Sequence, residues 1–235
     1  AGESHSQVQK IHMTMMQIFE SAVNDDILQK NPARGLKAPE AVAGTHRSIT
    51  DAERAAILKV AEDHPAGLWI KIMLYCGLRP SEAADLRWSD VDFPNALLSV
   101  SHSIGRQTTK TRAGVRRVPI PDELLDDLRA AKKKTRSIHI FTMADDISPM
   151  TQTRMTRLWK SFRRALDIEM GAQLYRNRIL VSKLAIDLSP YCLRHTFATD
   201  MQAAGVPLNV AKVLLGHSDI KMTANIYTHF TPEME

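Results

Sequence analysis

Apolar residues recur at helical spacing along much of the chain. One such stripe covers residues 7–30 and would need another surface to pack on. Thr50 and Glu53 form a capping-box pattern in front of a helix expected over residues 51–63. A strongly apolar run over residues 67–76 predicts a buried helix. These patterns indicate a chain built mainly of helices.

The hydrophobic period changes from helical to alternating in the middle of the chain. Residues 90–92, 96–100 and 115–120 alternate in this way and predict the strands of a small antiparallel sheet. Residues 138–141 are expected to form a short buried segment, and residues 175–182 a turn and a strand. The predicted fold class is therefore α+β, mainly α.

Helical spacing returns in the second half of the chain. It predicts helices over residues 121–134 and 151–170, a further helix that starts at Pro190, and one that follows Pro207 at a first-turn position. The residues expected to bury this last helix are Leu208, Val213 and Leu214. Another short helix, which Ser218 and Asp219 can cap, is expected to lead to Tyr227.

Helix-breaking residues separate the first helix from the rest. Proline and glycine recur over residues 31–35 and again over residues 39–44, which ends the helix and opens a linker. We therefore expect residues 1–38 to be the last helix of an upstream helical domain plus the linker. Residues 39–235 would form a second, larger domain.

Composition narrows the possible partners and compartments. The chain has 31 Lys and Arg against 26 Asp and Glu, and the net charge of +5 permits a polyanionic partner. No apolar run approaches the roughly 18 residues of a membrane span, and the polar start is unlike a signal peptide. Cys76 and Cys192 lie in apolar segments and suit a reducing compartment. A soluble, cytoplasmic protein is expected.

Three residues near the end of the chain suit attack on a phosphate. Arg194 carries a guanidinium that stays charged and matches two phosphate oxygens at once. His217 follows a helix-ending glycine, which places an imidazole at the start of a loop. Tyr227 offers a phenol whose phenolate leaves more readily than an alkoxide, so a phosphotyrosine bond is reversible. Taken singly, each residue is equally compatible with a surface, capping or core role.

A second arginine lies on a rigid corner. Arg79 stands between Gly77, which can end one helix, and Pro80, which can start the next, so its charge can be aimed. The alternative is a helix-capping arginine that pairs with Glu82. Two guanidinium groups suit a phosphodiester under attack, because fixed donors stabilise the charge that spreads over its non-bridging oxygens.

These motifs together resemble the tyrosine recombinase (phage integrase) family. The matching stretches are L-R-H-T-F-A-T from Leu193, L-L-G-H-S from Leu214, Y-T-H from Tyr227 and G-L-R-x-S-E-x-x-x-L from Gly77. The resemblance covers roughly residues 48–229 and is to an integrase of the phage or conjugative-transposon type. It implies a mainly helical catalytic domain with a small antiparallel β-sheet.

The resemblance also implies a mechanism. Tyr227 would attack a DNA phosphodiester to give a 3′-phosphotyrosine and a free 5′-hydroxyl, while Arg79 and Arg194 clamp the oxygens and His217 adds a hydrogen bond. The T-K-T and R-x-V-P-I stretches match the family's hairpin, so Lys110 would be the general acid for the departing 5′ oxygen. The alternative for Lys110 is a solvated loop lysine.

One position departs from the family pattern. Three residues before Arg194 the family usually places a histidine, thought to accept the nucleophile's proton, whereas this chain has Tyr191. Tyr191 can bond a phosphate oxygen or orient Tyr227, but a phenol, with an ordinary pKa of roughly 10, is a poor base at neutral pH. Water or the substrate phosphate could accept the proton instead. His195, one residue further on, is expected to have a structural role.

The implied partner is a double-stranded DNA recombination site, bound by a homo-oligomer, a tetramer on DNA, with no membrane. Neither a metal nor a nucleotide cofactor is required by this chemistry. The residues expected to contact DNA are Arg112, Arg116, Arg117, Arg154, Arg157, Arg176 and Arg178. Two alternatives stay open: a type IB topoisomerase that relaxes supercoils, and a catalytically silent DNA-binding module.

Overall fold

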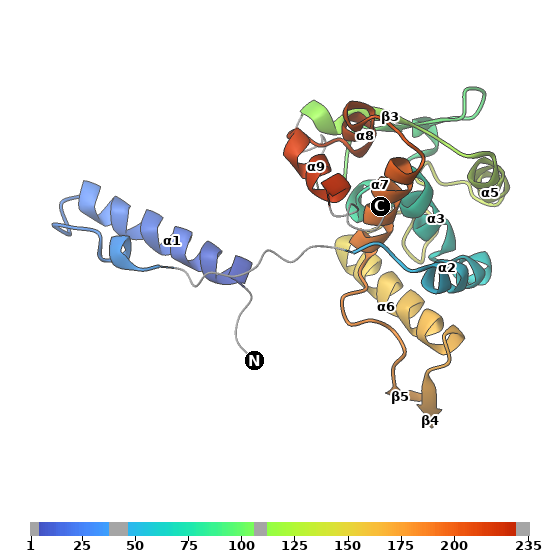
Figure 1. The fold of residues 1–235 in the computed structure, drawn as a ribbon, viewed down its shortest axis with the longest axis horizontal. Coiled ribbons are helices and arrows are strands. Elements are labelled where there is room, and N and C mark those ends of the chain that lie inside the picture. Colours follow the sequence, from blue (N-terminus) through green and yellow to red (C-terminus); the bar gives the residue numbers. More distant parts are fainter. Residues whose placement is uncertain (1–4, 38–46, 106–111, 229–235) are drawn as a thin grey trace, which may run out of the picture. The chain divides into compact units, whose positions relative to one another are not determined.

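The chain divides into two compact units, residues 1–45 and residues 46–235 (Figure 1). The computed structural model describes residues 5–37, 47–105 and 112–228, and of these residues 5, 6, 112 and 225–228 by their backbone alone. The predicted class is confirmed, because the larger unit is mainly helical and contains small antiparallel sheets.

The first unit contains helix α1 (His5–Asn24) and the short 3₁₀ helix η1 (Pro32–Gly35). The predicted extension of α1 to residue 30 is wrong, because the chain turns at Asp26, whose φ of 56° lies in the left-handed region. Asn31 then caps η1 by accepting from the amide of Ala33. Several apolar side chains of α1 are exposed, among them Ile11, Met13 and Ile18.

Helix α3 (Gly67–Cys76) lies at the centre of the second unit. It packs against α2 (Asp51–Asp63), α5 (Asp122–Lys132) and α7 (Pro190–Ala203), the last of which follows Pro190 as predicted. The Thr50–Glu53 capping box at the start of α2 is present as expected. Seven of the ten residues of α3 are buried, which explains why the sequence of this helix is apolar on almost every side.

The predicted antiparallel sheet is present, with strand order β1-β2-β3. It consists of β1 (Val91–Asp92), β2 (Leu97–Val100) and β3 (Arg116–Pro119), and the 3₁₀ helices η2 (Trp88–Asp90) and η3 (Arg112–Gly114) precede β1 and β3. Helix α4 (Pro80–Ala84) follows the corner at Arg79. The expected buried segment after residue 137 is only partly correct, since Phe141 is buried while Ile138 is exposed.

Helix α6 (Gln152–Glu169) buries the predicted apolar face, including Phe162 and Leu166, against the body of the unit. It leads into a second, two-stranded sheet of β4 (Gln173–Tyr175) and β5 (Arg178–Val181). The two turn residues, Arg176 and Asn177, both have positive φ, as the tightest hairpin turns require. This hairpin projects from the end of α6 (Figure 1).

The last described elements are α8 (Leu208–Leu215) and α9 (Ile220–Thr228). The prediction that Val213 is buried is wrong: Val213 is 61% exposed, and the buried residues of α8 are Ala211 and Leu215. Residues 211 and 215 lie four apart on one face, whereas residue 213 points away from it. Cys76 and Cys192, which lie in apolar segments of the sequence, are both buried.

Candidate active site

The buried side chain of Arg194 joins the ends of two helices. It lies on α7 and is 6% exposed. Its Nη1 donates to the carbonyl of Gly77, 2.6 Å away at the end of α3, and its Nη2 donates to the carbonyl of Leu215 at the end of α8. Gly77 must be glycine here, because its φ is +61° and an added Cβ would lie 2.2 Å from the ring of Phe197. Arg194 is therefore fixed by backbone atoms.

Arg79 lies at the corner before α4, and its side chain reaches the C-terminal end of α8. Its Nη1 lies 2.8 Å from Oε1 of Glu82 and its Nη2 donates to the carbonyl of Gly216 over 3.4 Å. About a third of the side chain is exposed, so Arg79 can still face a ligand. The sequence analysis gave two alternatives for Arg79, a capping residue paired with Glu82 or a site residue. The two roles are compatible, because the ion pair with Glu82 is present and also orients the guanidinium.

Glu82 is the shared carboxylate that the sequence analysis treated only as a capping partner. It is 3% exposed and pairs with Arg79 and with Arg116, while Arg194 lies 3.9 Å away. Burial alone raises the pKa of the Glu82 carboxyl, but the hydrogen bonds and charges of the arginines lower it to about 2. Glu82 is therefore ionised and holds the arginines in place.

Arg116 requires a correction, because its predicted DNA contact is incompatible with its position. The side chain is 1% exposed. It donates to Glu82 over 2.9 Å, to the carbonyl of Leu214 over 2.7 Å and to that of Gly114 over 3.0 Å. The sequence carries a signal for this, since residues 116 and 118 share the buried face of β3.

The carbonyl end of α8 is thus a binding site for three arginines. The successive carbonyls of Leu214, Leu215 and Gly216 accept from Arg116, Arg194 and Arg79, respectively. These carbonyls have no partners within the helix and carry the negative end of its dipole, so they attract cations.

His217 follows directly and is 7% exposed. Its Nδ1 lies 2.9 Å from Oγ1 of Thr223 on α9. Burial, followed by the charges of Arg194, Arg79 and Arg116, lowers the pKa of His217 to about 4. The imidazole is therefore neutral at neutral pH.

A cavity of about 230 Å³ brings these groups together, and its lining residues are Arg79, Tyr191, Arg194, His195, Leu215, His217 and Met222. Tyr191 is 44% exposed. His195 also lines the cavity, and its Nδ1 lies 3.3 Å from the hydroxyl of Ser48. This residue therefore has a structural hydrogen bond and also lies beside the site. The sequence analysis had not placed His195 there.

The side chains of two other predicted site residues lie outside the part of the chain that the structure describes. Lys110 lies in the segment 106–111. Tyr227 lies within α9, of which the backbone alone is described at that point. Their proposed roles stay predictions.

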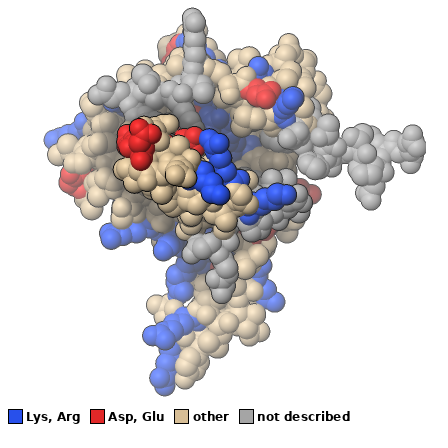
Figure 2. Space-filling model, turned by 90° about the vertical axis from the view of Figure 1, so that its left-hand side faces the viewer, with Lys and Arg blue, Asp and Glu red and all other residues tan. Residues whose placement is uncertain are grey.

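The remaining predicted DNA contacts lie on two surfaces. Arg117 on β3 is more than half exposed and pairs with Asp92, and Arg112 belongs to η3 with its side chain outside the described part. The others lie on α6 or its hairpin, and they are Arg154, Arg157, Arg176 and Arg178. Helix α6 and the β4–β5 hairpin form a projecting arm, and Figure 2 shows Lys and Arg gathered along this arm. Such a basic surface is suited to contact phosphates.

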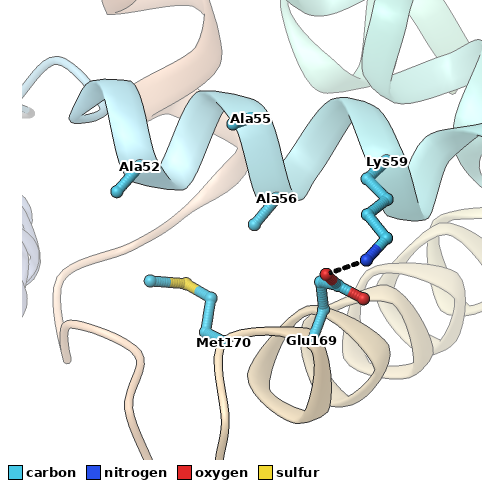
Figure 3. Close-up of a pocket in the computed structure, with 6 residues that line it drawn as sticks. All are labelled: Ala52, Ala55, Ala56, Lys59, Glu169 and Met170. Carbon is cyan, nitrogen blue, oxygen red and sulfur yellow. Dashed lines mark hydrogen bonds and ion pairs between the residues drawn. The ribbon is translucent and has the colours of Figure 1, made fainter.

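A larger cavity, of about 390 Å³, lies apart from these residues between α2 and α6 (Figure 3). Ala52 and Ala56 point from α2 toward the side of the cavity that holds Met170, Ala55 also lines it, and Lys59 pairs with Glu169 at one side over 2.6 Å. Among the described residues that line it, the charged ones are Lys59 and Glu169, which neutralise each other, so this lining offers no set of donors for a phosphate.

The lowered pKa of His217 predicts a pH dependence of stability. Its ordinary value of 6.5 lies above the folded value of about 4, so the unfolded chain binds a proton there before the folded chain does. The free energy of unfolding should therefore fall as the pH falls from about 6.5 to about 4, by on the order of 3 kcal/mol. Urea unfolding at several pH values should show a shallower decline for His217→Gln. An unchanged decline would contradict the prediction.

Two guanidinium groups and a neutral imidazole converge on one cavity, and such a set of hydrogen-bond donors is chemically suited to an oxyanion. Residues 47–234 match the model of the Phage integrase family. The chain therefore belongs to this family, as its motifs had indicated.

Relatives with similar sequences support the assignment. A tyrosine recombinase XerC-like protein of Caldanaerobacter subterraneus is 28% identical, over 100% of this chain and 65% of that protein. The transposase from transposon Tn916 of Enterococcus faecalis is 25% identical, over 98% and 60%. Tyrosine recombinase XerA of Thermococcus onnurineus is 30% identical, over 86% and 64%. The chain thus spans less than two thirds of the length of these relatives.

Solved structures confirm the fold. The Tn1549 transposon integrase in complex with a circular intermediate DNA has a TM-score of 0.76 at 22% identity, covering 96% of this chain and 76% of that one. A lambda integrase dimer bound to a core site has a TM-score of 0.67 at 19% identity, covering 98% and 76%. Within the described residues, every helix is too short or too polar to cross a bilayer.

Proposed function

We propose that this chain is the catalytic part of a site-specific DNA recombinase, an integrase that cuts and rejoins DNA through a 3′-phosphotyrosine. The observation that carries the proposal is the convergence of Arg79, Arg194 and His217 on one cavity. A phosphodiester placed there meets two guanidinium groups and a neutral imidazole, which are suited to the charge that develops on its non-bridging oxygens.

In the proposed reaction the phenolic oxygen of Tyr227 attacks phosphorus and the 5′ oxygen departs. Lys110 protonates that oxygen, and the phenolic proton passes to water or to the phosphate, because Tyr191 is a poor base. Attack by the 5′-hydroxyl of a partner strand then reverses the step and conserves the bond energy. The charge stabilisation comes from fixed arginines, and we propose that the reaction runs without a metal ion.

The proposed partner is a double-stranded recombination site, bound by several copies of the chain. Two structures of similar fold support this proposal: the Tn1549 transposon integrase in complex with DNA, and the lambda integrase dimer bound to a core site. The basic arm of α6 and the β4–β5 hairpin would contact the DNA backbone. Residues 1–38 are proposed to be the end of a separate helical domain and its linker, and residues 39–235 the catalytic domain.

A trapping experiment tests the function. The chain is incubated, in the presence of EDTA, with a library of nicked duplexes whose central sequence is randomised. The nick lets the short cleaved end diffuse away, so that a covalent adduct cannot be resealed. We expect a protein–DNA adduct that survives denaturation, and sequencing of the trapped DNA should identify the preferred site. DNA binding without an adduct would favour a silent binding module. An adduct that depends on added metal would contradict the metal-free mechanism.

The same trapped site distinguishes recombination from relaxation. A supercoiled plasmid with two copies of the site should yield exchanged or excised products. Relaxation of the plasmid with no exchange would instead favour a type IB topoisomerase, an activity for which the relatives offer no support.

A further inference from the structure

In the described part of the chain, the side chain of Thr223 makes one hydrogen bond, which joins it to the imidazole of His217. Its Oγ1 lies 2.9 Å from Nδ1, Thr223 is 0% exposed and His217 is 7% exposed. A buried hydrogen bond of this kind must have one donor and one acceptor, because water has no access to satisfy a mismatch. The direction of the bond therefore determines which ring nitrogen carries the proton of the neutral imidazole.

Other helical threonines indicate that direction. The hydroxyls of four of them donate to the carbonyl four residues earlier, and these are Thr14, Thr156, Thr196 and Thr199. For Thr223, the hydrogen bond found in the described part of the chain is the one to His217. Its hydroxyl proton is thus available for Nδ1, whereas in the other four it is used within the helix.

A donating Thr223 hydroxyl makes Nδ1 an acceptor and leaves the ring proton on Nε2. His217 lines the same cavity as Arg79 and Arg194, and Nε2 is the nitrogen that Thr223 leaves for a ligand there. We propose that Thr223 is a positioning residue that holds His217 in the Nε2–H tautomer, so that Nε2 donates a hydrogen bond to a non-bridging oxygen of the scissile phosphate. This inference rests on the function proposed above.

The tautomer matters here because the imidazolium form is suppressed. Burial and the charges of Arg194, Arg79 and Arg116 lower the pKa of His217, so a second ring proton is not present at neutral pH. In the other tautomer, Nε2 would present a lone pair to a phosphate oxygen and the two acceptors would repel each other. The hydroxyl of Thr223 thus decides between a stabilising and an opposing contact.

The first test needs no assay of recombination. The full chain is labelled with ¹⁵N-histidine and the ring nitrogens are recorded at neutral pH, with His217→Gln used to assign the signals. We expect the His217 Nδ1 to resonate as an unprotonated nitrogen and Nε2 as a protonated one. A protonated Nδ1 would overturn the inference whether or not the chain recombines DNA.

The second test uses a matched pair of variants at the same position. Thr223→Val keeps the shape and removes the hydroxyl, and Thr223→Ser keeps the hydroxyl. We expect Thr223→Val to reduce the rate of adduct formation by roughly 10–100-fold, with DNA affinity unchanged, because one donor to the transition state is lost. The Thr223→Ser variant should retain the rate within about threefold, since its donor is intact.

Each outcome of this pair supports or contradicts the inference. An undiminished rate in Thr223→Val, or an equal loss in Thr223→Ser, would overturn it, because the hydroxyl would then not be the determining group. If Thr223→Val melts at a lower temperature, its ¹⁵N spectrum still reports the tautomer. A wild-type chain that forms no adduct would contradict the proposed function, while the spectrum would still test the tautomer.

Discussion

Replacement of Tyr227 by phenylalanine is expected to abolish the covalent protein–DNA adduct, with a loss on the order of 10⁴-fold or more. The change removes one oxygen atom, which is the proposed nucleophile, and leaves the aromatic ring. DNA affinity should be retained because the arginines proposed to contact the phosphates are untouched. The measurement is the amount of denaturation-resistant adduct formed on the trapped site, beside a filter-binding or mobility-shift titration.

The chain offers its own control for this change in Tyr191, which also loses a hydroxyl when replaced by phenylalanine. Tyr191 lies at the cavity and is 44% exposed. We expect Tyr191→Phe to lower the rate by less than about tenfold, since it would lose at most one hydrogen bond to the phosphate or to Tyr227. If Tyr191→Phe abolished the adduct and Tyr227→Phe did not, the nucleophile would be misassigned.

Removal of the Glu82 carboxylate is expected to produce the largest loss of stability, about 3–5 kcal/mol in the free energy of unfolding for Glu82→Ala. The reason is that Arg116, with a side chain 1% exposed, would keep its charge in the interior with no counter-ion. Arg79 would also lose its aim, so adduct formation should fall as well. Urea unfolding followed by circular dichroism measures the first effect and the trapping assay the second.

Two variants make this prediction specific. Asp126→Asn breaks an ion pair with the same i,i+3 spacing, formed with Arg129 at 2.9 Å, but both side chains are more than half exposed. Its cost should stay below about 1 kcal/mol. The double variant Glu82→Ala, Arg116→Met should regain stability relative to Glu82→Ala, because the unpaired buried charge is gone. No recovery would mean that Glu82 stabilises the fold by other contacts.

Much of the fold can be predicted from local patterns in the sequence. The capping box at Thr50 and the apolar run before Gly77 gave the bounds of α2 and α3, because both depend on residues close in the chain. Alternation gave the three strands of the larger sheet. The end of α1 and the exposure of Val213 were predicted wrongly, since apolar side chains alone do not show where a helix stops or which face meets the core.

The candidate site was predictable in part for the same reason. Motifs identified Arg79, Arg194 and His217, and the structure brings all three to one cavity. The burial of Arg116 was missed, because a basic residue beside a basic loop was assigned to DNA despite its place on the inner face of β3. The carbonyl partners at the end of α8 belong to the backbone and have no side-chain signature at all.

Because each of these arginines also donates to a backbone carbonyl, one shared carboxylate, that of Glu82, is enough to orient the site without neutralising it. Among the described residues, the guanidinium groups of Arg79, Arg116 and Arg194 share the carboxylate of Glu82 beside an uncharged His217, which leaves an excess of two positive charges in and behind the cavity. A phosphodiester carries one negative charge, and addition of a phenolate brings a second. With or without the ammonium of Lys110, the pentavalent species would therefore balance the charge of the site better than the resting DNA does.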